Sequence, residues 1–152
     1  MEVIAAATGG MMGRVPDYLN VTFACFAGAS DVWARRGNER GAENIVNYQK
    51  LMKDRDLSTT HAIMNPVADR SKPDAQQMGG EISLHKVGEC AEGIIVRGAR
   101  MLATLAPFAD EISVYPGSPL QEGDEAYAIA FALPMSTPGL RDRKSTRLNS
   151  SH

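Results

Sequence analysis

The pattern of apolar residues changes near residue 57, and this change constrains the fold more than any other feature of the sequence. Residues 39–53 carry apolar side chains at helical spacing and a polar outer face formed by Asn44, Asn47 and Lys50. After residue 57 the chain consists of short extended segments separated by turn residues, and we expect strands at 59–64, 82–87, 93–96, 111–115 and 126–133. Helices followed by a segregated set of strands predict an α+β fold with an antiparallel sheet or barrel.

Two further features complete the expected core. Residues 21–29 are small and apolar, which predicts a buried helix. Cys25 and Cys90 lie far apart, without a CxxC motif or a neighbouring histidine. They therefore predict neither a disulfide framework nor a metal site, and we expect both to be small buried hydrophobic residues.

Composition and missing motifs exclude several classes of protein. The chain has 152 residues, 43% of them hydrophobic, and a net charge of −2, which does not suggest a nucleic-acid partner. No apolar run approaches the roughly 20 residues that a membrane helix needs. The first residues carry an acid and no basic segment, so we expect no secretory signal and a cytoplasmic location. The motifs of Rossmann dehydrogenases, P-loop enzymes, serine hydrolases and zinc proteases are all missing from the sequence.

Residues 141–152 differ from the rest of the chain because they are polar, basic and without any period. They resemble the in-frame translation of a sequencing-library adapter, and we expect them to lie outside the fold. On that interpretation the authentic protein continues beyond Leu140, and the chain is an internal fragment. The alternative is a basic tail that binds nucleic acid or membrane.

The densest chemistry lies at residues 61–70, where the helical and extended parts meet. An imidazole at His61, a turn at Pro66, a carboxylate at Asp69 and a permanent cation at Arg70 predict a site. The alternative is a satisfied polar residue at a strand end and a surface ion pair. Residues 71–80 are polar and end in two glycines, which predicts a mobile loop over the site or a plain connection.

A second group of candidates flanks Pro16. Arg14 precedes a helix that is expected to begin near Asp17, and Tyr18 lies in its first turn. A guanidinium and a phenol at a helix start form either an anion site or a pair that anchors the loop.

Three segments together carry a specific resemblance: GGMMGRVPDYLN at 9–20, HAIMNPVADRSKP at 61–73 and EGIIVRGARMLATLAPFAD at 92–110. They resemble the 4-hydroxyphenylacetate 3-monooxygenase family, the oxygenase components of two-component flavin-dependent phenol hydroxylases, over residues 1–140. The resemblance implies a fold similar to acyl-CoA dehydrogenases. Residues 1–57 would end the N-terminal helical domain and residues 58–140 would form a truncated central β-barrel, with the C-terminal helical bundle missing.

The resemblance also implies an activity. In this family a separate flavin reductase supplies reduced FAD (FADH2), which reacts with dioxygen to give a C4a-hydroperoxyflavin. This species ortho-hydroxylates a phenol such as 4-hydroxyphenylacetate. The parent protein is then expected to be a homo-oligomer, dimer or tetramer, with a small phenolic substrate and with neither nucleic acid nor membrane as a partner.

Site residues follow from the same resemblance, position by position. The catalytic and phenol-binding residues would be Arg14, Tyr18 and His61, with His61 holding or deprotonating the phenol. The flavin would contact His61, Ala62, Ile63, Val67, Ala68, Asp69, Arg70 and, near N5, Thr104. Residues 116–118, including Gly117 and Ser118, would close over the substrate.

Two alternatives remain. The related 4-hydroxybutyryl-CoA dehydratases use an iron–sulfur cluster as well as flavin, and such a cluster needs more cysteines than the two isolated ones present here. The other alternative is a non-catalytic, truncated flavin-binding fragment, since the isolated chain lacks the expected C-terminal bundle.

Overall fold

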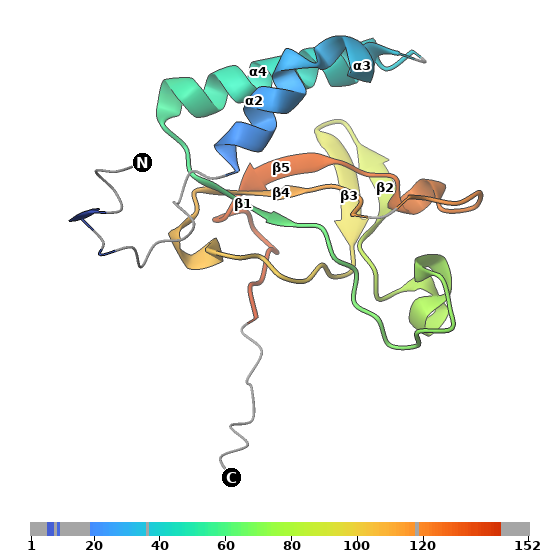
Figure 1. The fold of residues 1–152 in the computed structure, drawn as a ribbon. Coiled ribbons are helices and arrows are strands. Elements are labelled where there is room, and N and C mark those ends of the chain that lie inside the picture. Colours follow the sequence, from blue (N-terminus) through green and yellow to red (C-terminus); the bar gives the residue numbers. More distant parts are fainter. Residues whose placement is uncertain (1–5, 8, 10–18, 36, 118, 144–152) are drawn as a thin grey trace.

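The computed structural model describes residues 6–7, 9, 19–35, 37–117 and 119–143. Within these described residues the helices α2 to α4 come first and the strands follow, so the predicted α+β order is confirmed (Figure 1). The helices are α2 (Asn20–Gly28), α3 (Ser30–Ala34) and α4 (Glu39–Arg55). The strands are β1 (Thr59–Ala62), β2 (His85–Cys90), β3 (Gly93–Arg97), β4 (Glu111–Val114) and β5 (Phe131–Pro134), with short 3-10 helices η1 (Asp74–Gly80), η2 (Ala106–Phe108) and η3 (Glu125–Tyr127) between them.

Helix α4 is the long amphipathic helix that the sequence predicted, extended by two residues. Its first turn is capped by Asn38, whose side-chain oxygen accepts a hydrogen bond from the Gly41 N–H at 3.2 Å. Asp56 ends it in a left-handed conformation (φ 52°), and its N–H donates to carbonyls of the last turn. Three residues, 56–58, separate the end of the helix from the start of β1.

Aromatic side chains join the helices to the sheet. Phe23 on α2 packs against Tyr48 on α4 with ring centroids 5.1 Å apart, and Phe26 packs against Trp33 and Tyr115. Tyr48 also donates a hydrogen bond of 2.7 Å to the Glu111 carboxylate on β4. The three helices consequently lie on one side of the sheet, as Figure 1 shows.

The helix predicted at 21–29 is present, but the prediction that it is buried is wrong. Phe23 is its one buried residue, and Val21 is 66% exposed. Cys25 and Cys90 are both exposed, which contradicts the expectation that they are buried. Apolar composition alone predicted burial, but the other residues of α2 are half-buried or exposed in this structure.

The main sheet has three strands in the order β1–β4–β5. Strand β4 pairs in parallel with β1, which places Thr59 opposite Glu111 and Ala62 opposite Val114, and it pairs antiparallel with β5. The expectation of an antiparallel sheet is therefore wrong for β1 and β4. Parallel strands need a long crossover connection, and here the chain between them contains the β2–β3 hairpin.

The β2–β3 hairpin forms a separate two-stranded sheet with an irregularity between Lys86 and Gly88. Within the described residues the two sheets do not close into a barrel. The strand expected at 126–133 begins only at Phe131, because η3 occupies Glu125–Tyr127. Residues 71–80 contain η1 (Asp74–Gly80), which is interrupted by a kink with non-helical backbone at Gln77, Met78 and Gly79.

No helix in the described part of the chain is both long and apolar enough to cross a membrane.

Candidate active site

The parallel pairing of β1 and β4 brings the ends of both strands to one edge of the sheet. His61 lies near the end of β1, and Tyr115 follows directly after β4. The His61 Nδ1 atom is 3.0 Å from the Tyr115 hydroxyl, and the two rings meet edge to face at a centroid distance of 6.0 Å. Both side chains are half-buried. The contact holds the imidazole ring with its Nδ1 side toward the Tyr115 hydroxyl.

The residues after His61 are held in place by two other segments. The Ile63 carbonyl accepts a hydrogen bond of 3.2 Å from the Arg100 guanidinium. It also lies beside Gly117, where an added Cβ atom would be only 2.7 Å from the Ile63 oxygen. The predicted flavin-lining residues Ala62 and Ile63 and the predicted closing residue Gly117 are therefore in direct proximity.

The backbone of Thr104 lies beside β1. The buried Thr60 hydroxyl donates a hydrogen bond to the Thr104 carbonyl, which fixes that backbone next to β1. The Thr104 side chain itself is exposed. The structure thus brings Thr104 to the residue that precedes His61.

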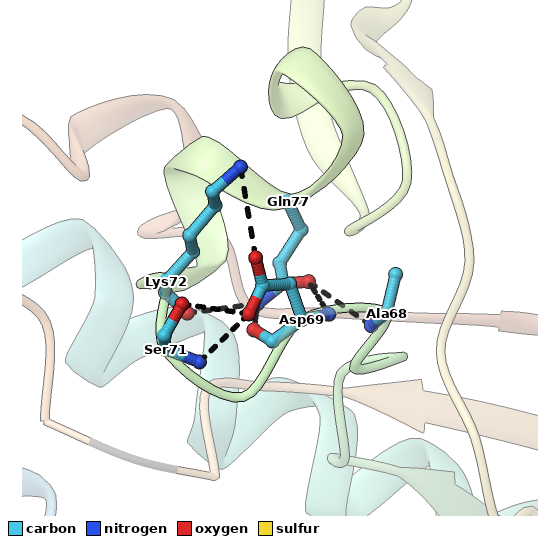
Figure 2. A network of polar contacts seen from close by, with 5 residues as sticks. All are labelled: Ala68, Asp69, Ser71, Lys72 and Gln77. Carbon is cyan, nitrogen blue, oxygen red and sulfur yellow. Dashed lines mark hydrogen bonds and ion pairs between the residues drawn. The ribbon is translucent and has the colours of Figure 1, made fainter.

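The predicted flavin-lining segment 67–70 is organised by a separate network (Figure 2). Gln77 on η1 is buried, with 1% of its surface exposed, and its side-chain oxygen accepts hydrogen bonds from the N–H groups of Ala68 (3.0 Å) and Asp69 (2.9 Å). Its side-chain nitrogen donates to the carbonyls of Asp69 (2.6 Å) and Lys72 (2.8 Å). All four hydrogen bonds of one side-chain amide are therefore made to this turn.

The charges in the turn are not arranged as an Asp69–Arg70 pair. The Asp69 carboxylate accepts hydrogen bonds from the Ser71 hydroxyl (2.7 Å) and N–H (3.0 Å), and Lys72 lies 3.6 Å away. These contacts, with the Ser71 hydroxyl first, hold the pKa of Asp69 below its ordinary value of 3.8. Arg70 is exposed and forms no ion pair with the described residues.

Several predicted residues lie outside the described part of the chain, namely Arg14, Tyr18 and Ser118. Conversely, sequence reasoning did not single out Tyr115 or Gln77. Tyr115 ended an expected strand, and only a parallel pairing of that strand with β1 would have placed it beside His61. Gln77 stood in a polar segment that offered no periodic signal, so its burial was not predictable from the pattern.

Comparison with known proteins places this arrangement in a family. Residues 1–147 match the family described as 4-hydroxyphenylacetate 3-hydroxylase, N terminal. The chain belongs to this family.

Individual relatives agree with the family match. The oxygenase component of 4-hydroxyphenylacetate 3-monooxygenase from Thermus thermophilus is 47% identical over 131 residues, which are 86% of this chain and 26% of the relative. The corresponding protein of Geobacillus sp. (strain PA-9) is 39% identical, over 90% of this chain and 28% of its own length. The chain therefore spans about a quarter of the length of the curated relatives it matches.

Solved structures show the same fold. A crystal structure of the oxygenase component of 4-hydroxyphenylacetate 3-monooxygenase, in complex with FAD and 4-hydroxyphenylacetate, matches with a TM-score of 0.74 at 47% identity, over 86% of this chain and 26% of that one. An archaeal 4-hydroxybutyryl-CoA dehydratase from N. maritimus matches with a TM-score of 0.72 at 21% identity, over 82% of this chain and 25% of that one. The second likeness shows a shared fold alone.

Proposed function

We propose that this chain is part of a reduced-FAD-dependent aromatic monooxygenase, which ortho-hydroxylates a phenol such as 4-hydroxyphenylacetate. The observation that carries the proposal is the edge of the main sheet where His61 lies beside Tyr115, with Gly117 packed against Ile63. A relative at 47% identity, whose structure contains FAD and 4-hydroxyphenylacetate, supports this choice of cofactor and substrate class.

The wider organisation of the parent protein is part of the proposal. Residues 1–57 end an N-terminal helical domain, residues 58–140 contribute strands to a central barrel, and residues 141–152 are not part of either. The parent receives FADH2 from a separate reductase in the cytoplasm, as expected for the oxygenase component of a two-component system. It assembles as a homo-oligomer, dimer or tetramer.

The turn at 67–72 suits a flavin. Val67 is 55% exposed and offers an apolar surface to a ring system, while Arg70 offers a cation that no described carboxylate neutralises. Asp69 is turned to Ser71 and Lys72, so its charge is already compensated. On this proposal residues 61–63, 67–70 and the Thr104 hydroxyl hold the flavin, which when bound as FADH2 supplies the activation of dioxygen.

His61 is the proposed base for the phenol. A phenol is a far better nucleophile as its phenolate, and an imidazole is the side chain best suited to take that proton near neutral pH. For this role the imidazole proton must lie on Nδ1 and be donated to the Tyr115 hydroxyl, so that the Nε2 lone pair accepts the proton of the phenol. Arg14 and Tyr18 are the further proposed phenol-binding residues, and Gly117 with Ser118 is proposed to close over the ring.

The test is His61→Ala in the full-length protein. The variant is expected to consume reduced FAD and dioxygen at a normal rate but to release hydrogen peroxide instead of hydroxylated product. His85→Ala is the matched control, because His85 contacts the Ser83 carbonyl and Tyr127 rather than this edge. Measurement of catechol product per FADH2 decides, and an unchanged yield in the His61 variant would contradict the proposed role.

A further inference from the structure

We propose that Gln77 is a positioning residue for the flavin: it fixes the turn at 67–72 so that Arg70 is presented to the cofactor in one conformation. This inference rests on the proposed function, because the turn is a flavin-binding element only if that function holds. Gln77 is not among the residues expected to touch flavin, and it acts through the backbone of its neighbours.

The first step of the argument is the completeness of the network. The Gln77 side chain has two donor hydrogens and two acceptor lone pairs, and the turn uses all four at distances between 2.6 and 3.0 Å (Figure 2). A buried amide with every group paired specifies one backbone arrangement, since any other arrangement leaves a polar group buried without a partner.

The second step is where these hydrogen bonds fall. The N–H and the carbonyl of Asp69 are both bound to Gln77, and so is the carbonyl of Lys72. Arg70 stands between these two anchored residues, with its side chain exposed. The position of the Arg70 backbone is therefore set by Gln77, although the two side chains make no hydrogen bond to each other.

The third step concerns which groups remain for a ligand. The N–H groups of Ala68 and Asp69 are already bound by Gln77, and the Asp69 carboxylate is bound by Ser71 and Lys72. Of the exposed side chains in this turn, Ser71 and Lys72 contact Asp69, which leaves those of Val67, Ala68 and Arg70 to contact a flavin. A turn that is fixed before binding loses less conformational freedom on binding. The Gln77 hydrogen bonds therefore raise the affinity for the flavin although Gln77 does not contact it.

The experiment compares Gln77→Met with Gln76→Met in the full-length protein. The two substitutions are the same chemical change at adjacent positions, but Gln76 is exposed and its side chain is not part of the network. Anaerobic fluorescence titration gives the dissociation constant for FADH2, and hydrogen exchange gives the protection of the Ala68 and Asp69 amides. Gln77→Met is expected to weaken FADH2 binding about tenfold or more and to expose both amides, with phenol affinity at saturating FADH2 unchanged. Gln76→Met is expected to match the wild type.

The possible outcomes separate the two proposals. If the two amides exchange faster in Gln77→Met but FADH2 affinity is unchanged, Gln77 is merely structural and the inference is overturned, while the proposed function stands. If the wild-type protein itself does not bind FADH2, the proposed function fails and the inference fails with it.

A second variant covers the case in which Gln77→Met does not fold. Gln77→Glu keeps the acceptor oxygen, but when ionised it places a second oxygen against the carbonyls of Asp69 and Lys72. Protonation restores a donor, so the loss of FADH2 affinity relative to wild type is expected to shrink as the pH falls. A loss that is constant across pH would overturn the inference.

Discussion

The main sheet and the β2–β3 hairpin are both built from short strands, yet they differ in how their side chains are covered. In the main sheet Thr59, Thr60 and Ser113 are at most 1% exposed, and Ile112 is 7% exposed. In the hairpin Ile94 and Ile95 are 45% and 50% exposed, and none of its described residues is buried. The candidate active site lies at the edge of the covered sheet.

The difference teaches what each sheet depends on. The hairpin pairs residues close in sequence, such as Cys90 with Gly93, so local propensity and a short turn are sufficient to form it. Strand β1 pairs with β4 across a long crossover, and this pairing is supported by the Tyr48–Glu111 hydrogen bond and by Ser113, whose hydroxyl donates to the Thr60 carbonyl at 3.1 Å. The site is therefore positioned by tertiary contacts rather than by strand propensity.

The largest expected loss of stability comes from a substitution in β4, the central strand of the main sheet. Ile112→Ala removes a buried side chain of β4 and is expected to lower the free energy of unfolding by about 3 kcal/mol, as large-to-small core substitutions do. Ile95→Ala, the same change in the hairpin, is expected to cost about 1 kcal/mol or less because that side chain is half exposed. Urea denaturation measures both, and equal costs would show that the two sheets do not differ in coverage.

Glycines provide a second matched pair. Gly117→Ala would place a Cβ atom 2.7 Å from the Ile63 carbonyl oxygen, so the backbone at the end of β1 must shift, at a cost of about 1–3 kcal/mol. At Gly88 in the hairpin the nearest atom would be the Ile95 Cδ1 at 3.8 Å, which is ordinary contact. Gly88→Ala is expected to leave the thermal midpoint unchanged within a degree or two. A similar loss in both variants would contradict the close approach at Gly117.

The same contrast explains how much of the fold was predictable. Helix α4 and the approximate positions of the five strands followed from local periodicity and turn residues. The parallel pairing of β1 with β4 did not, because each strand's own sequence is compatible with either direction and the choice is made by contacts with other elements. The expected strand at 126–133 failed at its start, where Tyr127 in η3 donates to the Gly80 carbonyl.

The site was predictable to the extent that its chemistry is carried by unusual residues. His61 and Arg70 were identified by residue type and by resemblance. The structure places His61 near the end of β1 and Arg70 in the turn at 67–72 that Gln77 holds. Tyr115 was missed because its partner is 54 residues away in the sequence. Cys25 shows the opposite error, since an apolar neighbourhood suggested burial and the residue is exposed. Contacts between distant residues are the part that residue patterns do not contain.

The third prediction concerns how the stability conferred by the contact between α4 and the main sheet depends on pH. Burial, followed by the hydrogen bond and charge of Glu111, raises the pKa of Tyr48 above its ordinary value of 10.0. The folded state then holds this proton more tightly than the unfolded state, so the stabilisation is complete below pH 10.0 and is lost as the pH rises above it. Tyr48→Phe is expected to cost about 1–2 kcal/mol near neutral pH and to show a shallower alkaline loss of stability.

Urea denaturation at a series of pH values between neutral and about 11 measures this difference. Tyr115→Phe is the control, because Tyr115 hydrogen-bonds His61 and is not linked to Glu111 by the contact that raises the Tyr48 pKa. Parallel alkaline profiles for wild type and Tyr48→Phe would show that the Tyr48–Glu111 contact does not stabilise the pairing of α4 with β4.

The smallest expected effect tests whether Tyr115, at the edge of the main sheet, contributes to hydroxylation through His61. Tyr115→Phe removes the hydroxyl that lies 3.0 Å from His61 Nδ1 but keeps the ring that packs against Phe26, so the fold is preserved. Loss of one hydrogen bond of about 1 kcal/mol corresponds to a roughly fivefold weaker preference for the imidazole tautomer with its proton on Nδ1, which is the tautomer that accepts the phenol proton on Nε2. In the full-length protein this is expected to lower hydroxylated product per FADH2 by a few-fold while FADH2 affinity stays unchanged. An unchanged product yield would show that Tyr115 only packs against the edge of the sheet. A fall in FADH2 affinity instead would show that the Tyr115 hydroxyl serves the flavin site rather than His61.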